Sequence, residues 1–509
     1  MIKQFMEMMK GWLRKLVRYK TIEQALNVNT TTISDKMQAA IKLWDSMFMD
    51  QAPWLDERKG IYSLNIAGQV CSELARSVTL EMNVNIHEPG SLEEAEGDDS
   101  KKINKDSRAF YLDGIIRTKV SNNLKEWLEH AMSVGGMILK PYPSNGSISV
   151  DMCLQGKFLP ISFDDDGRLT DVAFFDTFTL DGKRYTKVER HRLVKESAEN
   201  NESSVKVVIE NKAYLNENAG NSSSPNFNDI GNEIPLALVP QWASITPEAE
   251  VKNVDRLLFG WYRVPKANNI DRESPLGVAV FSKATHVIER ADYQYSRLDW
   301  EYEGGQMAID VDPTAFKPTM VAGKMETPIL NERLFRKVDL GQDKTYNAFT
   351  PDLRDESYLN GLNRYLMKIE DLCELSRGML CYDNAGGTYT NKEHLIMNKQ
   401  RFYSNVASNQ ASLENCLNDV IYAMNTYATL YQTAPEGEYE TDFNWDDSII
   451  TDMASLLNEK LQLQGRDILG KDEIRAWYTG ESLKTAQAKI AAIMSSKPDE
   501  LNDIFTRNL

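Results

Sequence analysis

The chain is poor in the two residue types that most often bind transition metals. Among its 509 residues are only five cysteines and five histidines. The cysteines are odd in number and form no C-x-x-C pair, and no histidine belongs to an H-E-x-x-H motif, so neither a disulfide framework nor a zinc site is expected. We therefore expect a reducing compartment, no metal and no cofactor.

Motifs that bind phosphates or activate a nucleophile are also missing. There is no G-x-x-x-x-G-K-[ST] segment, whose backbone would hold the phosphates of a nucleotide. There is no G-x-S-x-G turn either, which would present a nucleophilic serine. The sequence thus offers no residues for ATP hydrolysis or covalent catalysis, and we expect that the protein is not an enzyme.

Positive charge and long apolar runs are scarce as well. Lysine and arginine number 58 against 75 acidic residues, which gives a net charge of -17. Any contact with DNA should be loose, because surfaces that bind nucleic acid are usually basic. No apolar run reaches the roughly 18 residues of a membrane-spanning helix, so no membrane is expected. Residues 1–20 are a basic exception, and their pattern predicts an amphipathic helix packed on the rim of the protein rather than on a membrane.

The composition is typical of a globular protein, and the length predicts more than one domain. Hydrophobic residues make up 42% and charged residues 26%, which is ordinary for a soluble chain of mixed structure. Apolar spacing of three and four predicts helices in most of residues 1–133. Short alternating runs separated by Ser-Asn-Gly and Asp-Gly predict β-hairpins in about 134–245. The predicted fold class is α+β, mainly α.

Three further helices are predicted from their start signals. Ser274-Pro275 and Thr350-Pro351 each place a capping side chain before a proline, the residue favoured at the first helical position. Thr390 and Glu393 form a capping box. Each predicted helix has a stripe of apolar residues that is expected to pack against the rest of the protein. The stripe of the first helix includes Tyr295 and Tyr302, and that of the second includes Leu359. The third stripe is the longest and predicts a helix of roughly 60 Å; its residues are Leu395, Phe402, Val406, Leu413, Leu417, Val420, Met424, Tyr427 and Tyr431.

The stretch CYDNAGGTYT, Cys381–Thr390, separates the second helix from the third. Its glycine pair allows positive φ and a close approach of the backbone to another molecule. These residues alone are compatible with two interpretations: a connecting turn without a function of its own, or a functional loop that contacts another molecule.

The order of these parts resembles the portal proteins of tailed bacteriophages. A helical and hairpin-rich first half is followed by Ser-Pro-Leu-Gly and a long helix, an irregular insert, a second helix, a glycine-containing loop and a very long helix. Three local sequences are similar to portals of phages that infect Gram-positive bacteria: YTKVERHRL, NWDDSIITD and GKDEIRAWYTG. The resemblance covers nearly the whole chain.

The resemblance implies a portal-like architecture with long stem and wing helices, a β-hairpin-rich wing region, a small clip insert and a helical crown. Its divisions here would be a wing at 1–274, stem helix 1 at 275–304, a clip at 305–350, stem helix 2 at 351–378, a tunnel loop at 379–390, a long wing helix and following loop at 391–445, and a helical crown at 446–509. Such proteins form a ring, usually of twelve subunits, at one capsid vertex.

The family also implies a function and partners. Double-stranded DNA would pass through the ring without sequence specificity during packaging and ejection, driven by a separate terminase. Terminase, the major capsid or scaffold protein and a head-tail adaptor would be protein partners. The protein would be found in the virion, and in the host cytoplasm during assembly.

Candidate site residues follow from the same comparison. The loop residues that would meet DNA are Asn384, Ala385, Gly386, Gly387, Thr388 and Tyr389. Acidic residues that would line the stem channel and repel a polyanion are Glu289, Asp292, Asp299 and Glu303. Basic residues of the clip that would dock partners are Lys317, Lys324, Arg333, Arg336 and Lys337. The alternative is a helical scaffold or adaptor of a phage particle that does not enclose DNA.

Overall fold

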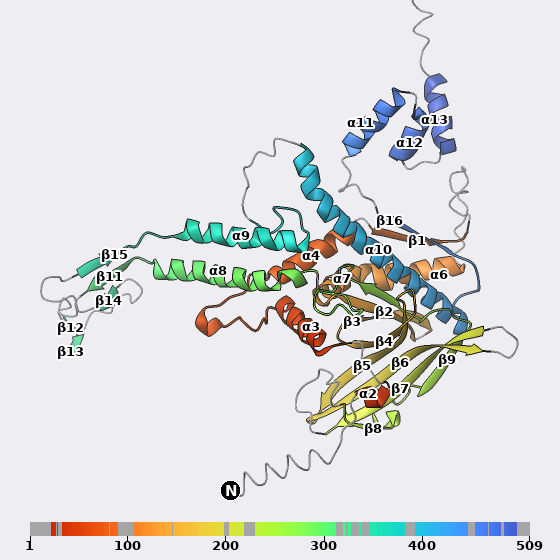
Figure 1. Ribbon diagram of the computed structural model, residues 1–509, viewed down its shortest axis with the longest axis horizontal. Helices are drawn as coiled ribbons and strands as arrows, with labels where there is room; N and C mark the ends of the chain where they lie inside the picture. Colours follow the sequence, from red (N-terminus) through yellow and green to blue (C-terminus); the bar gives the residue numbers. More distant parts are fainter. Residues whose placement is uncertain are drawn as a thin grey trace, which may run out of the picture.

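The computed structural model shows a mixed helical and sheet protein, which confirms the α+β class (Figure 1). Most of the buried apolar residues form one continuous core. The structure describes residues 22–26, 28, 33–80, 82–89, 106–144, 146–197, 203–217, 230–311, 319–321, 324–326, 335–337, 346–381, 392–445, 453–466, 468–479 and 483–495.

Most of the predicted hairpin region belongs to a six-stranded sheet. Its strand order is β4-β5-β6-β7-β8, and β9 also pairs with β7. The bounds are β4 Phe158–Phe163, β5 Leu169–Leu180, β6 Lys183–Ser197, β7 Ser203–Asn216, β8 Asn232–Ile234 and β9 Glu248–Lys252. Asp181 and Gly182 join β5 to β6 with φ of 51° and 73°, the left-handed geometry that a tight two-residue hairpin requires. The Asp-Gly signal is therefore confirmed as a turn.

A second sheet lies under the long helix α10, Lys392–Leu430. It contains β2 (Gly136–Ser144), β3 (Ser147–Leu154) and β10 (Gly260–Arg263) in the order β10-β2-β3. A Cβ atom on Gly260 would lie 2.1 Å from the carbonyl oxygen of Cys416 on α10. Only glycine allows the strand and the helix to approach this closely.

The helices of the N-terminal part agree with the predicted apolar spacing. The described elements are α2 Ile22–Leu26, α3 Asp35–Phe48, α4 Ile66–Thr79, α6 Arg108–Ile115 and α7 Asn122–Val134, with a π-helical turn Ile116–Ser121 before α7. Ser34 caps α3 by accepting a hydrogen bond from the backbone N–H of Met37. Met37, Ile41 and Trp44 are buried, and α3 contacts both α4 and α7.

One strand pair was missed in the sequence. β1 (Met82–His87) pairs antiparallel with β16 (Glu440–Trp445), so the stretch predicted as a loop after the long helix contains a strand. The burial of β16 alternates between exposed and half-buried, which is weak patterning for a strand of an antiparallel sheet. Its partner is more than 350 residues away, and no local signal could reveal the pairing.

Two of the three predicted helix starts are wrong. The first helix, α8, spans Thr285–Gly304, whereas the Ser274-Pro275 signal placed its start at 275. The chain between crosses another segment of backbone: a Cβ on Gly277 would lie 2.0 Å from the carbonyl oxygen of Gly135, and Val280 N donates a hydrogen bond to Met132 O. These tertiary contacts hold the segment out of a helix.

The second helix, α9, spans Asp355–Cys373 rather than starting at Thr350-Pro351. The backbone N–H of Arg354 donates to Glu301 of α8, which fixes the residues before α9 against its neighbour. The third helix is confirmed as long: α10 has 39 residues. Phe402, Val406, Leu413, Leu417, Val420, Met424 and Tyr427 of its stripe are buried, whereas Tyr431 is 53% exposed.

The C-terminal part is helical, as expected. Its helices are α11 Met453–Gln464, α12 Lys471–Thr479 and α13 Leu483–Ser495. α12 contacts both α11 and α13. The described helices include none that is both long and apolar enough to cross a membrane.

Candidate functional site

Helices α8 and α9 lie side by side as an antiparallel pair that extends from the body of the protein (Figure 1). Ile288, Ala291 and Leu298 of α8 are buried together with Leu362, Leu366 and Ile369 of α9. Gln294 Nε2 of α8 donates to the carbonyl oxygen of Tyr358 at 3.2 Å. Most of these residues belong to the continuous core, which thus extends between the two helices, and the Gln294 hydrogen bond fixes their register.

An ion pair joins the two helices at their outer end. Arg354 donates from its backbone N, Nε and Nη2 to the carboxylate of Glu301 at 3.1, 3.0 and 2.7 Å. These hydrogen bonds lower the pKa of Glu301 below its usual range. The contact defines where the helices end and the insert between them begins.

The four acidic residues predicted to line a channel do not share one environment. Asp299 and Glu303 are exposed on α8, and Glu289 is half-buried with an oxygen 3.3 Å from His286 Nδ1. Asp292 is only 2% exposed. Its oxygens accept hydrogen bonds from Trp54 Nε1 and from the backbone N–H of Leu64, both at 2.9 Å.

The prediction that Asp292 lines the channel is therefore wrong. Its carboxylate fixes α8 to the segment before α4 instead of facing solvent. Burial raises the pKa of Asp292, although these two hydrogen bonds act against the rise. Glu289, Asp299 and Glu303 remain candidates.

The insert between the helices, which the sequence marked as irregular, contains short strands. β11 (Ala308–Val311) lies between β14 (Phe335–Lys337) and β15 (Tyr346–Phe349). β12 (Thr319–Val321) pairs with β13 (Lys324–Glu326). Of the basic residues predicted to dock partners, Lys324 lies on β13 and Arg336 and Lys337 lie on β14. Lys317 and Arg333 lie outside the described residues.

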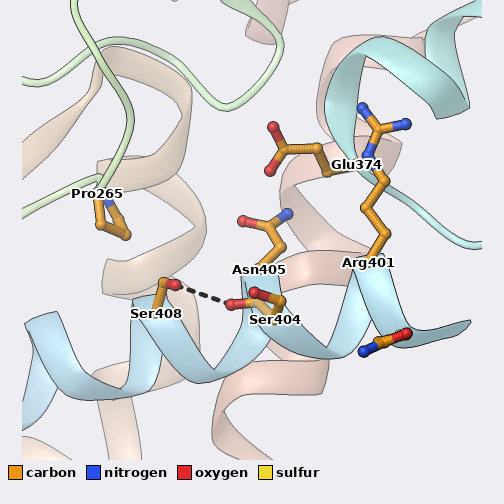
Figure 2. Close-up of a pocket in the computed structure, with 7 residues that line it drawn as sticks. Pro265, Glu374, Arg401, Ser404, Asn405 and Ser408 are labelled. Atoms are coloured by element: carbon orange, nitrogen blue, oxygen red, sulfur yellow. Dashed lines mark hydrogen bonds between the residues drawn. The ribbon is translucent and has the colours of Figure 1, made fainter.

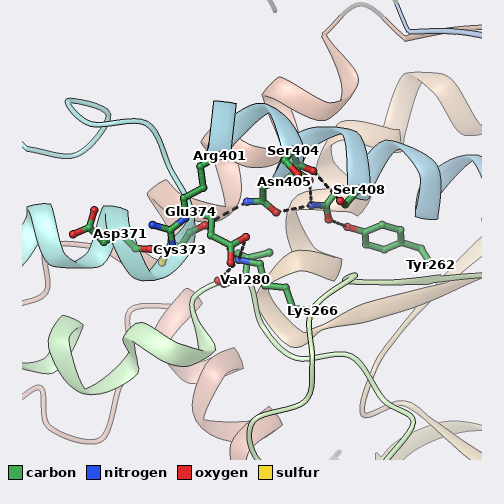
Figure 3. Close-up of polar contacts among 11 residues, drawn as sticks. Tyr262, Lys266, Val280, Asp371, Cys373, Glu374, Arg401, Ser404, Asn405 and Ser408 are labelled. Atoms are coloured by element: carbon green, nitrogen blue, oxygen red, sulfur yellow. Dashed lines mark hydrogen bonds and ion pairs between the residues drawn. The ribbon is translucent and has the colours of Figure 1, made fainter. Parts of the chain in front are cut away.

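At the other end of the pair, a polar junction joins α9 to α10 (Figure 3). The carbonyl oxygen of Cys373, the last residue of α9, accepts from Lys266 Nζ and from Asn405 Nδ2, each at 3.4 Å. Arg401 of α10 donates to Asp371 O at 2.7 Å. Side chains from two other segments thus satisfy carbonyls at the helix C-terminus, where positive charge is favoured.

The junction continues into the body through buried polar groups. Asn409 donates to the side-chain oxygen of Asn405 at 3.1 Å and accepts from Tyr262 Oη at 2.7 Å. Lys266 lies 3.6 Å from Glu374 and is 6% exposed at its side chain. Burial lowers the pKa of Lys266, while Glu374 raises it. A network of this kind specifies one arrangement of α9, α10 and β10, because each buried polar group needs its partner.

A second buried carboxylate fixes the chain as it leaves α9. Glu370 is 1% exposed and its Oε1 accepts backbone N–H hydrogen bonds from Gly378, Leu380 and Cys381 at 3.0, 2.8 and 3.1 Å. Arg377 Nη1 donates to its other oxygen at 3.2 Å. The chain therefore leaves the helix from a rigid turn. The predicted DNA-contacting residues Asn384 to Tyr389 lie outside the described residues.

A cavity of about 450 Å³ opens beside this junction (Figure 2). Glu374 and Arg401 lie on one side of it, and Ser404, Asn405 and Ser408 of α10 form its floor. Ser408 Oγ donates to the carbonyl oxygen of Ser404. These walls are polar, so the cavity suits a polar chain segment better than an apolar ligand. In the part of the chain that the structure describes, no group of three His, Cys, Asp or Glu residues could hold a metal ion.

No model of a protein family matches this chain, and no curated protein matches it in sequence. The residues that organise the junction, Glu370, Lys266 and Asn409, were not singled out in the sequence. Glu370 and Lys266 are ordinary charged residues there, and their contacts reach across chain separations that no local motif reports. The one available signal was the pair of asparagines at positions 405 and 409, which interrupts an otherwise apolar helical stripe.

Proposed function

We propose that this chain is a portal protein of a tailed bacteriophage, which assembles into a ring at one capsid vertex. The ring would form the channel for DNA packaging and ejection and would dock terminase and head-tail connector proteins. The antiparallel pair α8–α9 would form the wall of the channel, and the insert with β11 to β15 would form the docking surface. Hydrolysis of ATP would belong to the separate motor.

The observation that carries this proposal is that several large apolar side chains on α8–α9 are exposed to solvent in a single subunit. Trp300 is 64% exposed, and Tyr295, Tyr302 and Leu359, which the sequence assigned to packed stripes, are 37%, 43% and 40% exposed. A helix pair with apolar residues on more than one face is expected to bury them against other helices. Copies of the same chain arranged around a circle supply such helices on both sides.

The charge on the pair supports a DNA channel rather than a tight DNA-binding site. Asp299 and Glu303 are exposed, and carboxylates facing the channel would repel the phosphate backbone. DNA would then pass without adhering, because affinity for duplex DNA depends on neutralising its phosphates. The channel wall would guide DNA and would not select its sequence.

Native mass spectrometry of the purified full chain tests the assembly. We expect closed rings, and we expect Trp300→Ser combined with Leu359→Ser to reduce the ring fraction strongly, because both changes remove apolar contact area. Leu238→Ser is the matched control, since Leu238 is 69% exposed but lies outside the α8–α9 pair. A chain that stays monomeric at all concentrations, with and without scaffold protein, would contradict the proposal.

A further inference from the structure

A pocket of about 320 Å³ lies on one face of the hairpin β6–β7, beside α2. Side chains alternate along each strand, so residues two apart share a face. Val188, Arg190 and Arg192 of β6 therefore lie on the same face of the sheet as their neighbours Glu210, Lys212 and Tyr214 of β7, and all six line the pocket. Ala25 and Leu26 of α2 form its rim.

One of the two arginines is held in place by structural contacts. Arg190 Nε and Nη2 donate to the two oxygens of Asp171 at 2.9 and 2.6 Å, and Nη1 donates to the carbonyl oxygen of Leu26 at 2.6 Å. The bidentate ion pair neutralises Arg190, and the third contact anchors α2 at the pocket. These contacts use three of the five N–H donors of the Arg190 guanidinium, so the main role of Arg190 is to shape the site.

The other arginine has a donor that nothing uses. Arg192 Nη2 donates to Glu210 Oε1, but Arg192 Nε is buried and has no hydrogen-bond partner among the residues that the structure describes. A buried donor without an acceptor destabilises the folded chain. Such a group needs an acceptor, and Arg192 is one of the residues that line the pocket.

The charges of the pocket do not balance. Arg190 is paired with Asp171 and Arg192 with Glu210, whereas Lys212 is exposed and forms no ion pair in the described part of the chain. One positive charge is therefore left over, on a protein whose net charge is -17. Tyr214 adds a neutral hydroxyl, and burial raises the pKa of Tyr214 further, with a contribution from Glu233.

We propose that this pocket binds a carboxylate on an apolar stem, of the size of a glutamate side chain. Arg192 Nε and the ammonium group of Lys212 would donate to the carboxylate oxygens, and Val188 and Leu26 would contact the stem. A single negative charge matches the single excess positive charge. A phosphate dianion would place a second charge close to Glu210, so the carboxylate is the better match. This inference does not depend on the proposed function of the chain.

Saturation-transfer NMR on the full chain tests the pocket, because the method suits large proteins and weak ligands. The probes are N-acetyl-glutamate α-amide, its neutral analogue N-acetyl-glutamine α-amide, and butyrate. We expect the glutamate probe to bind with a dissociation constant on the order of millimolar, as a few charge-assisted hydrogen bonds would give. Weaker binding of butyrate would assign the site to an acidic side chain of a peptide, and equal binding to a free organic acid.

Three variants decide whether the named residues bind the probe. Lys212→Met should weaken binding by about tenfold, and Arg192→Lys, which keeps the charge but lacks the Nε donor, should weaken it by a similar factor. Lys252→Met is the matched control, since Lys252 is exposed on the neighbouring strand β9, and should leave binding unchanged.

Two results would overturn the assignment. One is equal binding of the glutamine and glutamate probes, and the other is binding that Lys212→Met does not affect. Titration with inorganic phosphate, followed by ³¹P linewidth, gives the competing outcome: tighter binding of phosphate than of the glutamate probe would show that the pocket does not select a carboxylate.

Discussion

Glu189 and His191 lie on the same face of β6, with His191 Nε2 2.8 Å from Glu189 Oε1. Lys140 Nζ lies 2.7 Å from this oxygen, and Lys187 Nζ lies 3.4 Å from the other. Burial lowers the pKa of His191, despite the opposing effect of Glu189. Burial of Glu189 is opposed by the hydrogen bond from His191 and by both lysines, which together hold the pKa of Glu189 well below its usual value. The pair is therefore a neutral imidazole beside an ionised carboxylate.

The first prediction is a loss of stability in mild acid. Because the pKa of His191 is lower in the folded chain than its unfolded value of about 6.5, the unfolded state binds more protons as the pH falls through that value. We expect the melting temperature to fall between about pH 7 and pH 5.5, and His191→Gln to make this dependence weaker. Glu189 does not contribute in this range, since its contribution is lost only below the usual carboxylate pKa of about 4.3. His286→Gln, at an exposed histidine, should leave the pH dependence as it is.

The second prediction concerns the buried carboxylate that fixes the end of α9. Glu370→Gln should lower the free energy of unfolding by about 2 to 3 kcal/mol, because three backbone N–H groups and Arg377 lose a charged acceptor. Asp371→Asn is the control, since Asp371 contacts the same arginine but its side chain is 47% exposed. It should cost less than about 1 kcal/mol. Equal losses in denaturant unfolding would show that the Glu370 contacts do not fix this turn.

The third prediction compares two glycines. Gly260→Ala should destabilise the protein by about 1 to 3 kcal/mol, because the new methyl group would overlap the backbone of α10. A Cβ on Gly114, within α6, meets no atom within 4 Å. Gly114→Ala should therefore stabilise the protein by about 0.5 to 1 kcal/mol, as expected in a helix. Thermal unfolding of the two variants gives opposite shifts, and shifts of the same sign would contradict the packing of β10 on α10.

The fourth prediction depends on the proposed function and on the sequence of the glycine-containing loop. Gly386→Val combined with Gly387→Val should disfavour positive φ and stiffen the loop. Rings should still form, because the contacts of α8–α9 and α10 lie elsewhere. DNA packaging or retention should fall, measured as the packaged genome length in an in vitro packaging reaction. Normal rings that package a full genome at the wild-type rate would show that this segment is only a connecting turn, without a role in packaging.

The features predictable from the sequence are those with a local cause. The stripe of α10 repeats often enough to define a helix of 39 residues, and the Asp-Gly turn of β5–β6 needs only its own two residues. Ser274-Pro275 failed as a start signal because the crossing of Gly135 and Gly277 holds the chain out of a helix, and this crossing is a tertiary contact.

The candidate site was harder to predict for the same reason. In the sequence, nothing distinguishes Asp292 from an exposed acidic residue of a helix. Its burial depends on hydrogen bonds with Trp54 and Leu64, which are more than 220 residues away. Glu370 and Lys266 likewise gain their roles from contacts with distant segments. Sequence patterns report which face of a helix is apolar, but they do not report which polar residue another segment will cover.

The two faces of β6 also restrict how its hairpin can form and change in evolution. β6 and β7 pair from Arg184↔Asn216 to Ser197↔Ser203, with Arg190 and Arg192 on one side and Glu189 and His191 on the other. A slip of one residue would exchange the two sets and separate each charge from its partner. The incorrect alignment is therefore penalised along much of the strand. Insertions or deletions in this hairpin should be tolerated mainly in steps of two residues, unless a bulge absorbs the extra one.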